Sequence, residues 1–208
     1  TLSAVSGVAT TVNLTFSGTA TLTSDYSRSA TSITIAAGST TGTITVDAAG
    51  DALDEDDETV TVSILNASNA TPAGDAQTVT ISDDDPLPSV SLSGGGQINT
   101  EAGGTATLTA TLSALSGRAV VVNVTYTGTA TAATDYTAAA SITIPAGSLS
   151  ASIALTSVGD ATAEAYESII ASIDSVTNGT ASGDPVTTTI VDDDRTIAGT
   201  VIDKDTLE

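Results

Sequence analysis

Four residue types that carry much of protein chemistry are missing from this sequence. Its 208 residues include no Cys, His, Met or Trp. Without Cys the chain has no disulfide and no thiolate metal site. Without His it lacks the most common general base and the most common ligand for transition metals. Any bound metal would therefore be held by oxygen atoms, and all-oxygen sites suit Ca²⁺ or Mg²⁺.

Aromatic and basic residues are scarce. Aromatic side chains make up 2% of the chain, and 4 Lys and Arg stand against 25 Asp and Glu, for a formal net charge of -21. Such a charge repels nucleic acid and anionic membrane surfaces. No apolar run approaches the roughly 18 residues of a membrane-spanning helix. We therefore expect cations as partners, no nucleic acid and no membrane insertion.

The same scarcities argue against an enzyme. A Ser or Thr nucleophile needs an activating base, but there is no His, and the only Lys is Lys204 near the end of the sequence. Paired carboxylates can cleave glycosidic bonds. Such sites usually lie in clefts lined by aromatic side chains, and this chain has one Phe and four Tyr. We expect a protein without catalytic activity.

The sequence repeats itself. Residues 1–26 and 111–136 share 16 identities in 26 positions at an offset of 110, which becomes 109 after one extra residue between Tyr26 and Ile33. The second offset places Asp51 opposite Asp160. Similarity over about 85 residues indicates tandem domains, because solenoid repeats run roughly 20–50 residues.

Both repeats alternate apolar and polar residues with the period of two that β-strands have. Val12, Leu14 and Phe16 show this alternation in the first repeat, and Val122 and Val124 show it in the second. Dense Thr, with Gly, Asn and Pro between the runs, also favours strands joined by turns. In the second repeat we expect strands at 89–93, 105–112, 119–126, 141–144, 150–156, 167–173 and 186–191. The pattern predicts an all-β chain of two tandem seven-stranded β-sandwiches.

The domain boundaries follow from the repeat. We expect a first repeat at 1–85, a stiff proline linker at 86–88, a second repeat at 89–194 and a tail at 195–208. The first repeat begins where the 105–112 strand of the second one ends, so we expect it to be truncated and to lack its N-terminal strand region. The tail either starts a further module or docks as a strand on an incomplete neighbour.

The order of the strands predicts where the acids gather. When neighbouring strands are antiparallel, alternate connections lie at the same end of a sandwich. Eight of the ten acids between Ser89 and Asp194 fall in the connections at one end or just after the last strand, and only Asp174 and Asp184 do not. In the first repeat the equivalent end carries Asp25, the acids of 51–58 and the triplet Asp83, Asp84 and Asp85.

Clustered carboxylates destabilise the folded state unless a cation binds between them. Two carboxylates about 4 Å apart repel by roughly 4 kcal/mol at an effective dielectric of about 20. Ca²⁺ accepts roughly 6–8 oxygens in an irregular geometry, which suits ligands from separate loops, whereas Mg²⁺ demands stricter octahedral order. A solvated acidic face is the alternative interpretation. The placement of the acids, its repetition and the scarcity of Lys favour Ca²⁺ sites.

Short motifs recur in the same order in both repeats. Gly-Thr-Ala-Thr followed by Asp-Tyr begins at Gly18 and Gly128, and Ile-x-Ile-x-x-Gly begins at Ile33 and Ile142. Gly-Asp with downstream acids and a closing Asp-Asp-Asp follow, and the second repeat also has Asn99-Thr-Glu-Ala-Gly-Gly-Thr-Ala near its first strand. Together these motifs resemble those of the Calx-β domain family over almost all of residues 1–194.

The resemblance implies immunoglobulin-like sandwiches with Ca²⁺ bound at the loops of one end. Carried over position by position, it marks as ligands Asp25, Asp51, Glu55, Asp83, Asp84 and Asp85 in the first repeat and Glu101, Asp135, Asp160, Glu164, Asp192, Asp193 and Asp194 in the second. The first repeat has no counterpart of Glu101. The connection at 157–166 in the second repeat has fewer acids than its equivalent in the first.

We therefore expect a calcium-binding structural or adhesive module of an extracellular or cell-surface protein, most consistent with a bacterial source. Ca²⁺ at the loop end would rigidify each domain and the linker between them. The expected partners are calcium ions, neighbouring domains of the same chain and, as an open point, a surface or matrix ligand. The alternatives are a regulatory Ca²⁺ sensor module of a membrane transporter and a ligand-binding adhesin domain.

Overall fold

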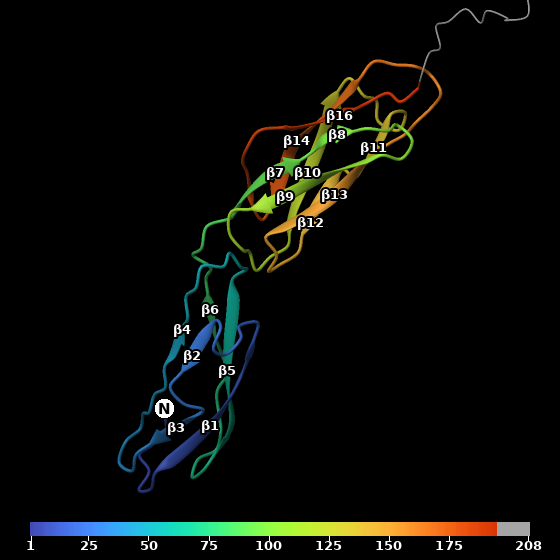
Figure 1. Cartoon of the computed structure of the whole chain (residues 1–208). Coiled ribbons are helices and arrows are strands. Elements are labelled where there is room, and N and C mark those ends of the chain that lie inside the picture. Colours follow the sequence, from blue (N-terminus) through green and yellow to red (C-terminus); the bar gives the residue numbers. More distant parts are fainter. Residues whose placement is uncertain (195–208) are drawn as a thin grey trace, which may run out of the picture. The chain divides into compact units, whose positions relative to one another are not determined.

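The computed structural model describes residues 1–194, and these residues form two compact units, of which the first is Thr1–Pro86 and the second starts at Leu87 (Figure 1). The boundary falls within the segment expected as a linker. Between residues 1 and 194 the chain forms strands and irregular connections, which confirms the all-β prediction. No helix in this part of the chain is long and apolar enough to cross a membrane. The expected tail at 195–208 lies outside the described residues.

Unit 2 is a sandwich of two five-stranded sheets. One sheet has the order β12 (Ser141–Ile144), β10 (Val120–Gly128), β14 (Glu167–Thr177), β16 (Val186–Ile190) and β8 (Gly96–Ile98). The other has the order β11 (Tyr136–Ala138), β13 (Ser150–Ser157), β9 (Thr105–Leu112), β7 (Ser89–Gly94) and β15 (Thr180–Ala181). Buried Val, Ile, Leu and Ala side chains from both sheets form one core, as expected for a chain with few aromatics.

Unit 1 repeats only part of this architecture. Its larger sheet has the order β3 (Ser32–Ile35), β1 (Thr10–Gly18), β5 (Glu58–Ala67) and β6 (Gln77–Ile81). Its second sheet is the pair β2 (Tyr26–Arg28) and β4 (Val46–Ala48). Strands equivalent to β7, β8 and β9 are absent from residues 1–86, in agreement with the prediction for the N-terminal strand region of the first repeat.

The missing neighbour explains a strand that is shorter than predicted. The alternation of Ile44 and Val46 predicts a longer strand than the three residues of β4. In unit 2 the equivalent strand β13 has eight residues and pairs with β9 from Ser150 to Thr156. Because a strand is held by its ladder of hydrogen bonds, β4 shortens where no such partner lies beside it.

All seven predicted strands of the second repeat are present, but three short strands were not foreseen. They are β8, β11 and β15, which have three, three and two residues. Runs this short leave no detectable period in a sequence. β8 arises because the chain crosses from one sheet to the other at Gly94, Gly95 and Gly96, all with positive φ. A Cβ on Gly94 would lie 2.2 Å from the carbonyl oxygen of Thr107, so only glycine fits at this crossing.

Each unit buries one threonine hydroxyl that has no hydrogen-bond partner among residues 1–194, at Thr10 and at Thr188. At the equivalent positions of the other unit the sequence has Val120 and Val79. A buried polar group without a partner costs about 1–3 kcal/mol, and valine has nearly the same shape as threonine. These two hydroxyls therefore lower the stability of the fold.

We expect Thr188→Val to raise the free energy of unfolding of unit 2 by about 1 kcal/mol, because it removes the unpaired hydroxyl without opening a cavity. Denaturant unfolding followed by circular dichroism measures the change. Thr188→Ser is the matched control, since it keeps the hydroxyl and deletes a methyl group, and it should destabilise the unit. A valine variant that is no more stable than the original chain would contradict this account.

Candidate metal centres

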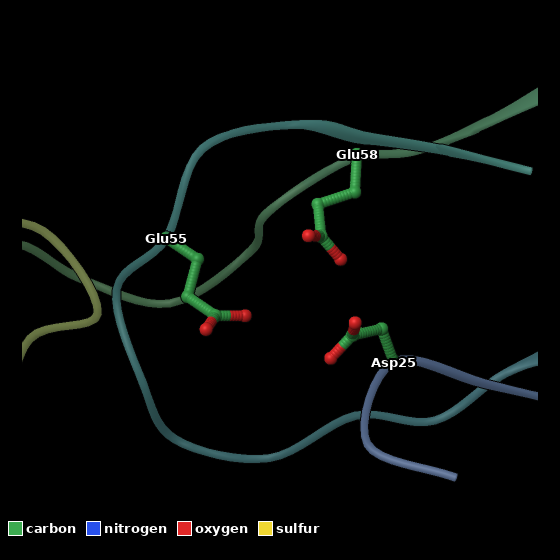
Figure 2. A group of neighbouring side chains, drawn as sticks. All are labelled: Asp25, Glu55 and Glu58. Atoms are coloured by element: carbon green, nitrogen blue, oxygen red, sulfur yellow. The ribbon is translucent and has the colours of Figure 1, made fainter. Parts of the chain in front are cut away.

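Three carboxylates of unit 1 meet at one point. Asp25, Glu55 and Glu58 each bring an oxygen to within 4.8 Å of the other two. Figure 2 shows the three carboxyl groups directed toward one another, Asp25 from the segment before β2 and Glu55 from the loop before β5. All three side chains are half-buried, and Glu58 is the first residue of β5.

The position of Asp25 is fixed by a local turn. Its carboxylate accepts a hydrogen bond from the backbone N–H of Thr21, and its own N–H donates to the Thr21 carbonyl at 3.0 Å. The next residue, Tyr26, is 5% exposed and packs into the unit. The Gly-Thr-Ala-Thr and Asp-Tyr motif therefore forms a turn that holds one carboxylate at the end of the sheet.

The remaining predicted acids of unit 1 surround this group. Asp51 and the triplet Asp83, Asp84 and Asp85 line a cavity of about 240 Å³ together with Asp25, Glu55 and Glu58. The backbone N–H of Asp83 donates to Asp57 at 3.0 Å, which ties the segment after β6 to the loop before β5. The structure thus places every acid marked in the first repeat around one cavity.

Unit 2 has the equivalent group. Asp135, Glu164 and Glu167 each bring an oxygen to within 4.8 Å of the others, and they stand 110 or 109 residues after Asp25, Glu55 and Glu58. The carboxylate of Asp135 accepts a hydrogen bond from the N–H of Thr131 at 2.6 Å, as Asp25 does from Thr21. The duplicated sequence has therefore produced the same arrangement twice.

A second group in unit 2 contains the only buried acid of the three groups. Glu101, Asp192 and Asp194 each bring an oxygen to within 4.8 Å of the others, and Glu101 is 7% exposed. Glu101 lies in the connection between β8 and β9, whereas the aspartates follow β16. Segments that are distant in the sequence therefore meet at this end of the sandwich.

The triplet of Asp192, Asp193 and Asp194 also forms hydrogen bonds with the surrounding loops. The backbone N–H of Glu164 donates to Asp192 at 3.2 Å, and that of Glu101 donates to Asp193 at 3.3 Å. The N–H of Asp194 donates to the other oxygen of Asp192 at 3.0 Å. The triplet therefore organises the loops while its remaining carboxylate oxygens stay available to a ligand.

The structure separates the thirteen predicted ligands into three classes. Seven lie in the groups of three, namely Asp25, Glu55, Glu101, Asp135, Glu164, Asp192 and Asp194. Asp51, Asp83, Asp84, Asp85 and Asp193 lie beside a group. Asp160 belongs to no group, and its carboxylate accepts a hydrogen bond from the N–H of Thr162 at 2.6 Å.

Two members of the groups were not marked by the sequence. Glu58 and Glu167 are the first residues of β5 and β14. The order of the strands places both at the acidic end, but no motif names them as ligands. Their equivalence at the offset of 109, combined with their position at the start of a strand, is the signal that identifies them.

The carboxylates raise one another's pKa. Loss of hydration raises the pKa of Glu55, and four neighbouring charges raise it further; they are Asp51, Asp25, Asp83 and Asp85. Loss of hydration likewise raises the pKa of Glu101, followed by the charges of Asp192, Asp194, Glu164 and Asp193. The pKa values of Glu58 and Glu167 rise for the same reasons and through hydrogen bonds to Asp25 and Asp135. Each group is therefore a concentration of negative charge that a cation would relieve.

This repulsion predicts an unusual pH dependence in metal-depleted buffer. A carboxyl whose pKa is raised by folding binds its proton more tightly in the folded state, so protonation favours folding. The stability should be highest below the ordinary carboxyl pKa of about 4.5 and should fall as pH rises through the raised pKa values. We expect the melting temperature without metal to increase between about pH 7 and about pH 5.

Differential scanning calorimetry of the metal-depleted chain measures this trend. Excess CaCl₂ at the same pH values is the control, because a bound cation would favour the ionised carboxylates and remove the gain on acidification. A melting temperature that falls steadily from neutral pH toward pH 5 without metal would contradict the repulsion inferred from the groups.

Comparison with known proteins finds one matching family model and several similar solved structures. A family model described as the Calx-beta domain matches residues 3–85 and again residues 89–195. Among solved structures, CBD12 from CALX1.2 is 19% identical with a TM-score of 0.34, over 80% of this chain and 68% of that chain. The calcium binding domain CBD12 of CALX1.1 is 18% identical with a TM-score of 0.33, over 90% of this chain and 71% of that chain. No curated protein matched the chain.

Proposed function

The chain belongs to the Calx-beta domain family, with two tandem members over most of its length, and on this premise we propose that each unit binds Ca²⁺ through the carboxylates at its acidic end. The observation that carries the proposal is the set of three groups of three carboxylates. Each group joins segments that are separate in the sequence, so an ion there would connect the loops of its unit.

The burial of the acids supports a metal site over a solvated surface. Of the nine residues in the three groups, only Glu164 is exposed. A solvated acidic face would keep its carboxylates in water, where their pKa values stay ordinary. Here the pKa values of Glu55, Glu58, Glu101 and Glu167 are all raised. The fold therefore holds like charges close together, and a cation bound between them would relieve their repulsion.

The donor set fits Ca²⁺ better than other metals. Every donor is an oxygen, as a hard cation requires, and the chain has no Cys or His for a softer metal. Carboxylates on separate loops give an irregular shell, which Ca²⁺ accepts and Mg²⁺ accepts poorly. In unit 1 the ion would be held by Asp25, Glu55 and Glu58. In unit 2 the candidate ligands are Asp135, Glu164 and Glu167 and, separately, Glu101, Asp192 and Asp194.

We propose that the role of the bound ion is structural, in an extracellular or cell-surface protein. Free Ca²⁺ is abundant outside cells, and extracellular modules bind it with dissociation constants on the order of 10⁻⁴–10⁻³ M. Asp83, Asp84 and Asp85 directly precede Pro86, so an ion beside them would also fix the direction in which the chain leaves unit 1. Small-angle scattering profiles that coincide with Ca²⁺ and with chelator would contradict this effect on the linker.

Isothermal titration calorimetry of the metal-depleted chain tests the calcium proposal. We expect saturable heat with CaCl₂ and much less with MgCl₂. Glu58→Gln should remove the binding assigned to unit 1 and leave that of unit 2. Asp174→Asn is the matched control, because Asp174 is an exposed acid outside the groups and its loss changes the net charge by the same amount. Equal losses in the two variants, or no saturable heat, would reject specific calcium sites.

A further inference from the structure

The chain contains a single Asn-Gly sequence, at Asn178 and Gly179. The other five asparagines precede Leu, Ala, Thr or Val, and no aspartate precedes a glycine. The backbone nitrogen that follows an asparagine can attack the carbon of the side-chain amide. Glycine permits this attack most readily, because it has no Cβ to block the approach and its backbone is flexible. Asn178 is therefore the asparagine whose sequence most favours spontaneous loss of its amide.

The structure places Asn178 in the turn between β14 and β15, with a positive φ of 58°. Its side-chain nitrogen donates a hydrogen bond to the carbonyl of Ala119 at 2.9 Å. The N–H of Gly179 donates to no acceptor among residues 1–194. The attacking nitrogen is thus not held by the fold, and the hydrogen bond to Ala119 is the one contact of the amide that the reaction must break.

Unit 1 contains the same turn with a different following residue. Asn69 lies 109 residues before Asn178, has a φ of 56° and donates from its side chain to the carbonyl of Ala9 at 2.9 Å. The next residue is Ala70, where unit 2 has glycine. The two turns therefore share their backbone conformation and their side-chain hydrogen bond, and they form an internal comparison of the reactivity of Asn-Gly and Asn-Ala.

The turn in unit 2 attaches β15 to β7, the first strand after the linker. The N–H of Thr180 donates to Pro88 at 2.9 Å, and the N–H of Ser182 donates to Val90 at 2.7 Å. β15 has two residues and pairs in parallel with the start of β7. A Cβ on Gly179 would lie 3.2 Å from the carbonyl oxygen of Pro88, so the turn packs closely against the start of the unit.

We propose that Asn178 deamidates spontaneously in the folded chain and that the modification releases β15 from β7. The Gly179 nitrogen gives its proton to solvent and bonds to Cγ of Asn178, and the amide nitrogen leaves as ammonia, which produces a cyclic imide. Water then opens the ring, so the net reaction consumes one water and releases one ammonia. Opening at the side-chain carbonyl gives aspartate. Opening at the main-chain carbonyl gives isoaspartate, whose main chain is longer by one methylene group.

Both products disturb the turn. Each replaces the amide donor with a carboxylate that faces the carbonyl oxygen of Ala119, so the hydrogen bond is lost and two oxygens repel. Isoaspartate also lengthens a turn that packs closely against Pro88. The hydrogen bonds from Thr180 and Ser182 should then break. This inference concerns a position outside the acidic groups, goes beyond calcium binding and does not depend on it.

The test is to age the full chain in mildly alkaline buffer below its melting temperature. Peptide mass spectrometry, with fragmentation that distinguishes isoaspartate from aspartate, measures conversion at each asparagine over time. We expect Asn178 to convert at least about tenfold faster than Asn69, which corresponds to a barrier lower by about 1.4 kcal/mol. The rate should rise with pH, because the attacking nitrogen must lose its proton, and conversion should occur both with CaCl₂ and with chelator.

Two reciprocal variants assign the reactivity to the following residue. Gly179→Ala gives unit 2 the sequence of unit 1 and should slow conversion of Asn178 at least about tenfold. Ala70→Gly should speed conversion of Asn69 by a similar factor. A Cβ on Gly179 would lie 3.0 Å from the side chain of Val176, so circular dichroism checks that this variant is folded. The exchange in unit 1 introduces no new atoms and tests the same point independently.

Hydrogen exchange of the aged chain, separated from unmodified chain by ion exchange, measures the release of β15. The amides of Thr180 and Ser182 should lose their protection. Unchanged protection there would overturn the release of β15. Absent conversion at Asn178, conversion at an equal rate at Asn69, or unaltered rates in both exchange variants would overturn the assignment of the site. Calcium binding is measured separately by calorimetry, so a failure here leaves that proposal standing.

Discussion

Calcium is expected to raise the melting temperature of this chain by an amount on the order of 10–20 °C. A ligand that binds only the folded state stabilises it by about 2.7 kcal/mol when its free concentration is about a hundred times the dissociation constant. For a domain of about 100 residues, each 1 kcal/mol shifts the melting temperature by about 4–8 °C. The effect is large here because the metal-free chain carries unrelieved repulsion at each group of carboxylates.

A thermal melt with titrated CaCl₂, compared with chelator, measures this shift. MgCl₂ at the same concentrations is the control for ionic strength and for divalent charge, and it should change the melt much less. The shift should grow with the logarithm of the calcium concentration above saturation. If calcium did not change the melting temperature, the acids would form a solvated charged surface and not metal sites.

Neutralising Glu101 is expected to have opposite effects with and without calcium. In the chain without metal, Glu101→Gln removes one buried charge beside Asp192 and Asp194, so the free energy of unfolding of unit 2 should increase. With calcium, the same change removes a charged ligand and should weaken ion binding by about 1.4 kcal/mol or more, which is a tenfold change in the dissociation constant. The melting temperature of the Glu101→Gln variant should therefore be above that of the original chain without calcium and below it at high calcium.

Asp184→Asn is the control for this variant. Asp184 is an exposed acid of unit 2 that belongs to none of the three groups, and its neutralisation changes the net charge equally. It should shift the melting temperature slightly and in the same direction under both conditions. If Glu101→Gln stabilised unit 2 equally with and without calcium, Glu101 would be a source of repulsion but not a ligand.

The alternation of side chains is what made the fold predictable from sequence. Runs such as Val122, Asn123 and Val124 turn successive residues to opposite faces, and Val122 and Val124 are indeed buried in the core of unit 2. The predicted boundaries agree with the observed strands to within two residues except at β14, which continues to Thr177. A half-exposed strand end such as this one carries little apolar signal.

The sequence predicts the end of the sandwich at which the acids gather, but it does not predict which of them come together in each group. Strand order brings Glu101 and the residues after β16 to the same end, although they are far apart in the sequence. It does not say which oxygens converge, because that depends on local turns such as the one at Asp135 and on hydrogen bonds such as that from Glu164 to Asp192. Asp160 shows the limit: it aligns with Asp51, which lines the acidic cavity of unit 1, yet Asp160 belongs to none of the groups of unit 2.

The crossing at Gly94, Gly95 and Gly96 also determines how unit 2 responds to mechanical force. It makes β8 a parallel neighbour of β16, with Ile98 beside Ile190, and the N–H of Val191 donates to Ile98 at 2.9 Å. Tension applied between Leu87 and Asp194 pulls these two strands in opposite directions along their length. Their hydrogen bonds are then loaded together in shear rather than opened one at a time. The parallel pair of β8 and β16 would therefore resist stretching of the chain more than a ladder that is opened from one end.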